Sequence, residues 1–181
     1  MKNGMVRLSG IAYESLVNGP GLRRVFFAQG CRHNCAGCFN PSTHPFDGGE
    51  LVDMNELIED IKINIMLKGV TFSGGDPLEQ ADKFAYIAMK IKDIGLNIWC
   101  YTGYTFEYIL RHRYEKNGWN ELLKYIDILV DGRFEEEKKQ SSIKYRGSSN
   151  QRIIYVQKSL EIGEVILVNY DDKMYSSDKC L

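Results

Sequence analysis

Three of the five cysteines in this 181-residue chain lie close together, at Cys31, Cys35 and Cys38. An odd number of cysteines with three of them this crowded is a poor framework for disulfides. In a reducing compartment such a group more often binds a metal or an iron–sulfur cluster, because soft thiolate ligands favour these species. The spacing C-x3-C-x2-C therefore predicts a metal centre held on one tight loop.

The number of local ligands favours an iron–sulfur cluster. A 4Fe–4S cluster ordinarily takes four cysteine ligands, whereas this loop supplies three, so one iron would be free to bind a substrate or cofactor. Small residues between the cysteines, including Gly37, would let the loop wrap closely around a cluster. The alternative is a zinc site completed by His33, His44 or Cys180. Zinc sites usually combine two separated ligand pairs, and this sequence has no second pair.

The composition is that of a soluble globular protein, with 44% hydrophobic and 26% charged residues. A formal net charge of -1 provides no electrostatic footprint for duplex nucleic acid or an anionic membrane. The sequence contains no apolar run long enough for a transmembrane helix, and its start lacks the apolar core of a signal peptide. We therefore expect a cytoplasmic protein that binds neither nucleic acid nor membrane, with a single domain over residues 1–181.

Hydrophobic periodicity predicts strands that alternate with helices. The expected strands cover residues 5–14, 23–29, 70–73, 96–101, 127–130, 152–156 and 164–169. The expected helices cover residues 53–68, 105–113 and 117–124, with a further helix that is capped by Asp76 and stops at Gly95. This alternation implies a parallel α/β sheet. Because a full TIM barrel needs about 250 residues, we expect an incomplete barrel or an open sheet.

Residues 132–151 form a polar stretch with no helical or strand periodicity. A loop of this length is uncommon in a compact domain unless it has a function. We expect a lid or a partner-binding segment that becomes ordered on docking of the partner, with Arg146 and Asn150 in contact with it.

A second motif, Ser73-Gly74-Gly75-Asp76-Pro77, lies where a buried strand passes into a helix. Glycines at such a point permit positive φ and a close approach of the backbone to a ligand. The carboxyl edge of an α/β sheet is where ligands bind, and Asp76 with the free strand carbonyls would suit an ammonium group. The alternative is a turn in which Asp76 only caps the helix, and the motif taken alone favours that alternative.

Together the two motifs resemble the radical S-adenosylmethionine (SAM) superfamily, whose hallmark is C-x3-C-x2-C followed by a GGE-type motif. Segments 18–23 (NGPGLR) and 29–31 (QGC) resemble the lead-in of the glycyl-radical-enzyme activases, and 38–41 (CFNP) resembles their exit. Segments 101–104 (YTGY), 127–132 (DILVDG) and 146–152 (RGSSNQR) resemble the branch that activates anaerobic ribonucleoside-triphosphate reductase.

This resemblance implies a radical SAM core and a specific reaction. Cys31, Cys35 and Cys38 would hold a 4Fe–4S cluster, and the SAM amino and carboxylate groups would chelate the fourth iron. An external one-electron reductant such as flavodoxin would drive reductive cleavage of SAM. The resulting radical would remove a hydrogen atom from a glycine in the glycyl-radical subunit of the reductase. The radical is carried by the cofactor, so no side chain is expected to act as a catalytic acid or base.

The resemblance also implies a set of residues around SAM. They are Gly37, Cys38, Phe39, Ser73, Gly74, Gly75, Asp76, Thr102 and Asp131. The family often has an aromatic residue just before the third cysteine; here that position is Gly37, and Phe39 would take over packing beside the adenine. The acid of the GGE motif is Asp76, one methylene shorter. Thr102 and Asp131 would border SAM or a cation, with a turn-forming Asp-Gly as the alternative for Asp131.

Three alternatives remain open at this point. The chain resembles other glycyl-radical-enzyme activases, such as that of pyruvate formate-lyase. A small-molecule radical SAM enzyme such as 7-carboxy-7-deazaguanine synthase is a second alternative, although no residues for a pterin are recognisable. A non-enzymatic zinc-binding or other metal-binding module is the third, and a colourless zinc protein would distinguish it from a brown iron–sulfur protein.

Overall fold

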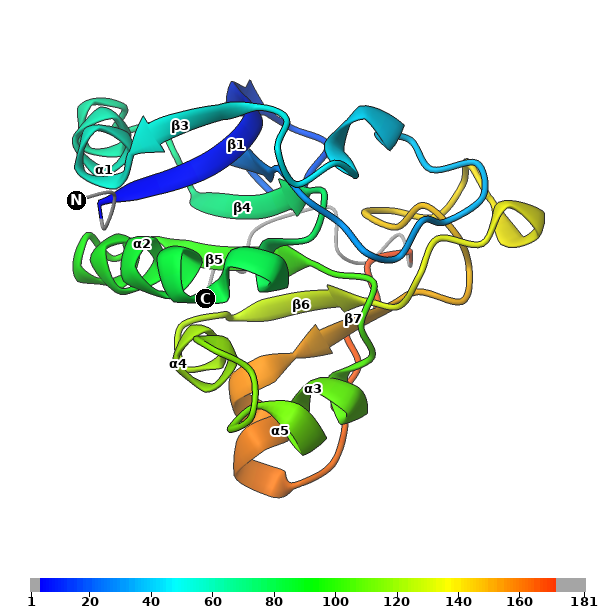
Figure 1. The fold of residues 1–181 in the computed structure, drawn as a ribbon. Helices are drawn as coiled ribbons and strands as arrows, with labels where there is room; N and C mark the ends of the chain where they lie inside the picture. The colour runs from blue at the N-terminus through cyan, green and yellow to red at the C-terminus, as the bar shows by residue number, and fades with distance from the viewer. Residues whose placement is uncertain (1–3, 172–181) are drawn as a thin grey trace.

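The computed structural model describes residues 4–171, which form a seven-stranded sheet in the order β3-β1-β2-β4-β5-β6-β7 (Figure 1). The strands are β1 (Met5–Ser15), β2 (Arg23–Ala28), β3 (Glu50–Asp53), β4 (Gly69–Gly74), β5 (Asn97–Tyr101), β6 (Ile128–Asp131) and β7 (Arg152–Tyr155). The α-helices are α1 (Met54–Ile63), α2 (Ala81–Asp93), α3 (Phe106–His112), α4 (Trp119–Leu123) and α5 (Val156–Ile162). Short 3-10 turns are η1 (Pro41–Thr43), η2 (Pro77–Gln80) and η3 (Glu136–Lys138).

The centre of the sheet is parallel, as the alternation of strands and helices predicts. Parallel pairing joins β2 to β4, β4 to β5 and β5 to β6, so the carboxyl ends of these strands meet at one edge. The outer pairs β1–β2, β1–β3 and β6–β7 are antiparallel, which the sequence analysis did not anticipate. Parallel strands need a crossover, usually helical, whereas residues 132–151 return from β6 to β7 without an α-helix. The predicted α/β class with a partial parallel barrel is confirmed.

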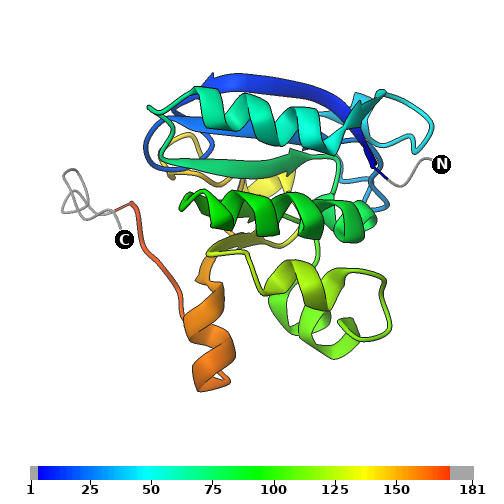
Figure 2. The ribbon, with the colours of Figure 1, turned by 90° about the vertical axis from the view of Figure 1, so that its left-hand side faces the viewer.

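Helices α1, α2 and α4 lie over one face of this sheet, as Figure 2 shows from the helical side. Helix α2 buries Phe84, Ile87 and Ile91, which recur at helical spacing and so form a single apolar stripe. The Phe84 ring lies 4.8 Å from that of Phe72 on β4, which joins helix and strand in one core. Within residues 4–171, none of the helices has the length and hydropathy of a membrane-spanning segment.

Three parts of the predicted secondary structure differ from the structure. Helix α1 ends at Ile63 instead of continuing to residue 68, because the Asn64 side chain accepts the Met66 N–H and turns the chain. The short edge strand β3 and the helix α5 were not predicted. The expected strand over 164–169 is reduced to one bridge between Ile154 and Leu167. Of these segments, β3 is the one whose partner, β1, lies far away in the sequence.

The end of α1 leads to a stability prediction. Ile61 is 1% exposed, and Ile65, four residues later, is 90% exposed. We expect Ile61→Ala to lower the free energy of unfolding by about 2–5 kcal/mol, because it leaves a core cavity. Ile65→Ala should change it by less than about 0.5 kcal/mol. Urea unfolding of both variants checks this, and equal losses would mean that the apolar face of α1 continues through residue 65.

Candidate cluster and cofactor site

A cavity of about 840 Å³ opens at the carboxyl ends of the parallel strands. All three clustered cysteines line it, together with the ends of β4 and β5 and part of the segment 132–151. Its lining includes Cys31, Cys35, Cys38, Phe39, Ser73, Gly74, Gly75, Tyr101, Thr102, Gly103, Phe134 and Tyr145. The structure thus brings both predicted motifs, separated by more than thirty residues in the sequence, to one cavity.

The cysteine loop reaches this cavity through two left-handed turns. Its start is fixed by the Cys31 N–H, which donates to the carbonyl of His44 at 3.1 Å. Asn34 has a φ of 46° and Gly37 a φ of 67°, and the Cys38 N–H donates to the Cys35 carbonyl at 3.2 Å, which closes a turn between the second and third cysteines. The positive φ of Gly37 explains the glycine, since residues other than glycine rarely adopt it. Gly37 itself does not line the cavity, so its role is to shape the loop.

The thiols are suited to a group that replaces their protons. Burial, with smaller contributions from Asp76 and the neighbouring thiols, raises the pKa of Cys31 to about 11. Burial also raises the pKa of Cys35. Metals and clusters bind thiolates, so three half-buried thiols on one cavity fit a cluster that displaces these protons. Cys100 is fully buried in the core, as predicted, and Cys180 lies outside the described residues.

The two glycines at the end of β4 allow a close approach of two backbones. Gly74 has a φ of 97°, and a Cβ there would lie 2.6 Å from the backbone of Ala28. The Gly75 N–H donates to the Ala28 carbonyl at 2.8 Å, and the Asp76 N–H donates to the Gly30 carbonyl at 2.9 Å. The end of β4 is therefore joined directly to the residues that lead into the cysteine loop. Both glycines also line the cavity, beside the cysteines.

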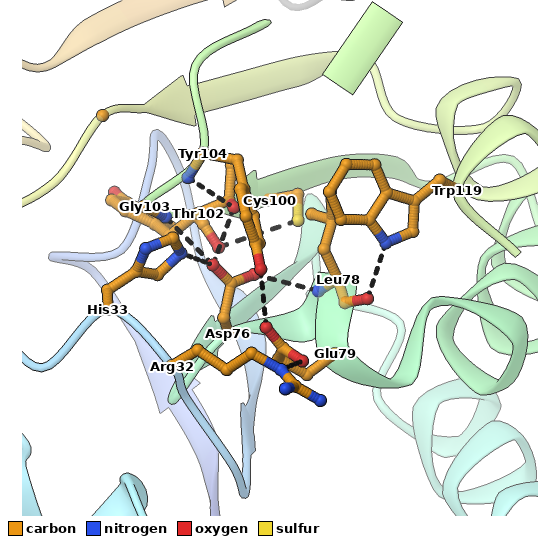
Figure 3. A network of polar contacts seen from close by, with 12 residues as sticks. Arg32, His33, Asp76, Leu78, Glu79, Cys100, Thr102, Gly103, Tyr104 and Trp119 are labelled. Atoms are coloured by element: carbon orange, nitrogen blue, oxygen red, sulfur yellow. Dashed lines mark hydrogen bonds and ion pairs between the residues drawn. The ribbon is translucent and has the colours of Figure 1, made fainter. Parts of the chain in front are cut away.

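Asp76 is fully buried and accepts four hydrogen bonds within the chain (Figure 3). Its Oδ1 accepts the Leu78 N–H at 2.9 Å, which is the predicted cap of the following turn. Its Oδ2 accepts the Thr102 hydroxyl at 2.8 Å, the Gly103 N–H at 3.0 Å and His33 Nε2 at 2.8 Å. Asp76 does not line the cavity, so the expected direct contact with a SAM ammonium group has no support in this geometry.

His33 is the site residue that sequence reasoning missed. The sequence offers it as a zinc ligand or as an exposed loop residue without a role, whereas its side chain is buried against Asp76 and Tyr104. The sequence carries one indirect signal: Gly103, in the YTGY segment, is small because a Cβ there would lie 2.4 Å from the imidazole. Without the fold, nothing in the sequence links this glycine to His33.

Thr102 and Asp131 have different surroundings. Thr102 lines the cavity while its hydroxyl donates to Asp76, so it lies next to the expected SAM site. Asp131 is 1% exposed and does not line the cavity. Its Oδ2 accepts the Phe106 N–H at 2.7 Å, and its Oδ1 accepts Arg152 Nε at 3.0 Å. The expected contact of Asp131 with SAM or a cation has no support here, because this carboxylate holds α3 and β7.

Phe39, directly after the last cysteine of the motif, lines the cavity with its side chain 57% exposed. Its ring lies 4.8 Å from that of Phe134, and the Lys139 ammonium lies 5.0 Å from its centre. An exposed aromatic ring at the cavity is available to pack against a flat ligand. This position agrees with the expected packing beside an adenine.

The segment 132–151 is folded by its own hydrogen bonds. The Gln151 amide binds the Gly147 N–H at 2.8 Å and the Gly132 carbonyl at 3.0 Å, and the Asn150 amide donates to the Arg133 carbonyl at 2.8 Å. The Arg146 guanidinium pairs with Asp171. The expectation that the segment orders only on binding a partner is therefore wrong for this structure. Arg146 and Asn150 support the segment, which forms one wall of the cavity.

Comparison with known proteins identifies the family. Residues 17–154 match the model of a 4Fe-4S single cluster domain. The chain is 36% identical over 146 residues to the anaerobic ribonucleoside-triphosphate reductase-activating protein of Vibrio cholerae, covering 76% of this chain and 90% of that one. Its identity to the protein of the same name from Enterobacteria phage T4 is also 36%, covering 76% and 86%. For the Escherichia coli K12 protein the identity is 34%, covering 78% and 94%.

The chain belongs to the family of anaerobic ribonucleoside-triphosphate reductase-activating proteins. The resemblance stated from the motifs is thereby confirmed, including the branch within the glycyl-radical-enzyme activases. The 4Fe–4S cluster predicted from the cysteine spacing is confirmed as well. These matches overturn the zinc module and the two other radical SAM alternatives.

The surroundings of Asp131 lead to a second prediction. Asp131→Ala should lower the free energy of unfolding by about 1–3 kcal/mol, because it leaves the buried Phe106 N–H without an acceptor. Glu107→Ala removes only the more exposed partner of Arg152, so it should lower the free energy of unfolding by less than about 1 kcal/mol. SAM affinity of folded Asp131→Ala should stay within about threefold, a change of less than about 0.7 kcal/mol, because this carboxylate does not line the cavity. A larger loss in equilibrium dialysis would show that Asp131 reaches the cofactor.

Proposed function

We propose that this chain activates an anaerobic ribonucleoside-triphosphate reductase by using a 4Fe–4S cluster on Cys31, Cys35 and Cys38, with SAM bound beside it. The observation that carries this proposal is the meeting of three thiols, the Gly74–Gly75 strand end and an open cavity at one sheet edge. The function named for the curated relatives agrees with it. When bound, the cluster and SAM would supply a one-electron reductive cleavage of an S–C bond of SAM, and the carbon radical released would take a hydrogen atom from a reductase glycine.

The residues of the cavity have distinct tasks in this proposal. The three thiolates bind the cluster. The backbone at Ser73, Gly74 and Gly75 lies next to them and would take the amino-acid part of SAM. Phe39 would pack against the adenine. A volume of about 840 Å³ lies within the range of roughly 300–1,000 Å³ that is usual for small-molecule sites.

Two loops form walls of this open cavity. The cysteine loop forms one wall, and the segment 132–151 forms another through Phe134 and Tyr145. An external one-electron reductant, such as flavodoxin, and a cytoplasmic location are further parts of this proposal.

The deciding experiment is an anaerobic incubation of the reconstituted chain with SAM, a one-electron reductant and candidate glycyl-radical enzymes. We expect the glycyl-radical signal in electron paramagnetic resonance on anaerobic ribonucleoside-triphosphate reductase. A signal on pyruvate formate-lyase but not on the reductase would contradict the proposed partner. SAM cleavage without a glycyl radical on either enzyme would contradict the activation itself.

A third prediction concerns the cluster ligands. Replacing any one of Cys31, Cys35 or Cys38 by Ala should abolish cluster assembly and SAM cleavage together, because no other thiol lines the cavity in the described residues. Cys100→Ala is the matched control, since this thiol is buried in the core, and should retain its iron. Iron and sulfide per chain are the measurement. A Cys35→Ala protein that kept its full cluster would overturn the ligand assignment.

A fourth prediction concerns Phe39. Phe39→Ala should keep the cluster but weaken SAM binding, because stacking of a base on an aromatic ring contributes about 1–3 kcal/mol, roughly five- to 150-fold in affinity. Tyr114→Ala, which removes an exposed aromatic ring that does not line the cavity, is the control. Equilibrium dialysis with labelled SAM measures both variants. Equal affinity in the two would show that Phe39 does not contact the adenine.

A further inference from the structure

We propose that His33 is a positioning residue: its hydrogen bond to Asp76 holds the cysteine loop against the strand ends of the cavity and so sets where the three thiols lie relative to Gly74 and Gly75. The proposal deepens the proposed function, because it assigns a task to the residues between the first two cysteines. The inference therefore rests on the proposed function, in which both the cluster and SAM bind in this cavity.

The imidazole of His33 is held on three sides. The side chain is 5% exposed, and Nε2 lies 2.8 Å from Asp76 Oδ2. A carboxylate only accepts hydrogen bonds, so Nε2 carries the hydrogen. The Tyr104 ring stands edge-on at 4.4 Å between ring centres. On the third side the imidazole packs directly against Gly103, where a Cβ would lie 2.4 Å from the ring.

The partner of His33 is itself fixed to two strand ends. The same Asp76 oxygen accepts bonds from Thr102 and Gly103 after β5, while the Asp76 backbone follows β4 directly. One buried carboxylate therefore connects the cysteine loop with the ends of both strands, as Figure 3 shows. A shift of His33 away from Asp76 would leave the start of the loop joined to this edge through the Asp76 N–H and the Gly30 carbonyl, but it would remove the buried side-chain bond of the loop to the same edge.

The neighbouring residue provides a natural comparison. Arg32 Nε donates to Glu79 at 2.8 Å, and Glu79 also accepts the Tyr104 hydroxyl at 2.7 Å. The Arg32–Glu79 pair also joins the cysteine loop to the turn after β4, but the Arg32 side chain is 71% exposed. Glu79 is only 8% exposed but keeps the Tyr104 hydroxyl as a donor, and the exposed guanidinium is screened by solvent, so this pair contributes little, whereas a buried bond to a carboxylate is hard to replace. His33 is accordingly the residue that fixes the loop, and Arg32 is its control.

The test uses His33→Ala, His33→Gln and the control Arg32→Ala. In the cluster-free protein, hydrogen exchange of the amides of residues 31–38 should be at least tenfold faster in His33→Ala. After reconstitution this variant should keep its iron. The SAM concentration that gives half of the change in the electron paramagnetic resonance spectrum of the reduced cluster should rise at least tenfold. Arg32→Ala should stay within about threefold of the natural protein, as expected for an exposed pair.

Two further variants separate positioning from a general loss of structure. His33→Gln keeps an N–H that can donate to Asp76 and should restore both readouts to within about threefold of the natural protein. Gly103→Ala keeps His33 but places a methyl group where the imidazole lies, so its loop amides should exchange as fast as those of His33→Ala. The second variant provides the test if His33→Ala does not fold.

Several results would overturn the inference. A His33→Ala protein with natural exchange rates and SAM response would show that the loop needs no such bond. A folded His33→Ala protein without iron would place His33 in cluster assembly instead of positioning. Failure of His33→Gln to restore function would mean that the imidazole itself is required. If the natural protein neither assembles a cluster nor responds to SAM, the proposed function fails, and the exchange measurement still tests the bond alone.

Discussion

The site depends on the burial of one carboxylate. Removing an ionised group from water is costly unless hydrogen bonds replace the lost hydration. Asp76 meets this condition with four donors, which come from the cysteine loop, the turn after β4 and the end of β5. Each donor lies where a chain segment leaves the sheet or enters the cavity. The requirement to satisfy this charge therefore holds the segments that form the site in one arrangement.

Glycine makes this arrangement possible on both sides of the carboxylate. Gly74 and Gly75 let the end of β4 lie against Ala28 and Gly30, so the cysteine loop starts at a fixed place. Gly103 leaves the space that His33 occupies. The short glycine-containing motifs of the sequence are thus sites of close packing between segments, in addition to any contact they make with a ligand.

Local patterns predicted the parts of this protein that depend on nearby residues. The cysteine spacing indicated the cluster, and the apolar stripe on α2 and the alternation of elements indicated a parallel sheet. The antiparallel edges depend on tertiary pairing and were missed. The end of α1 at Ile63 depends on a local bond to the Asn64 side chain, which helical periodicity does not report, and the helix α5 was missed as well. The partners of Asp76 and Asp131 are 26 or more and 21 or more residues away, apart from the Leu78 cap, so no local signal reveals them.

The spacing of the parallel strands also sets the width of the cavity mouth. One wall follows β2 and the other follows β6, with β4 and β5 between them. Neighbouring strands are about 4.8 Å apart, so the three spacings from β2 to β6 separate the points at which the two walls leave the sheet by about 14 Å. Sheets packed face to face lie about 10 Å apart, which is the thickness of one extended chain with its side chains. Loop substitutions can reshape the rim, but only the gain or loss of a whole strand would change this basic width.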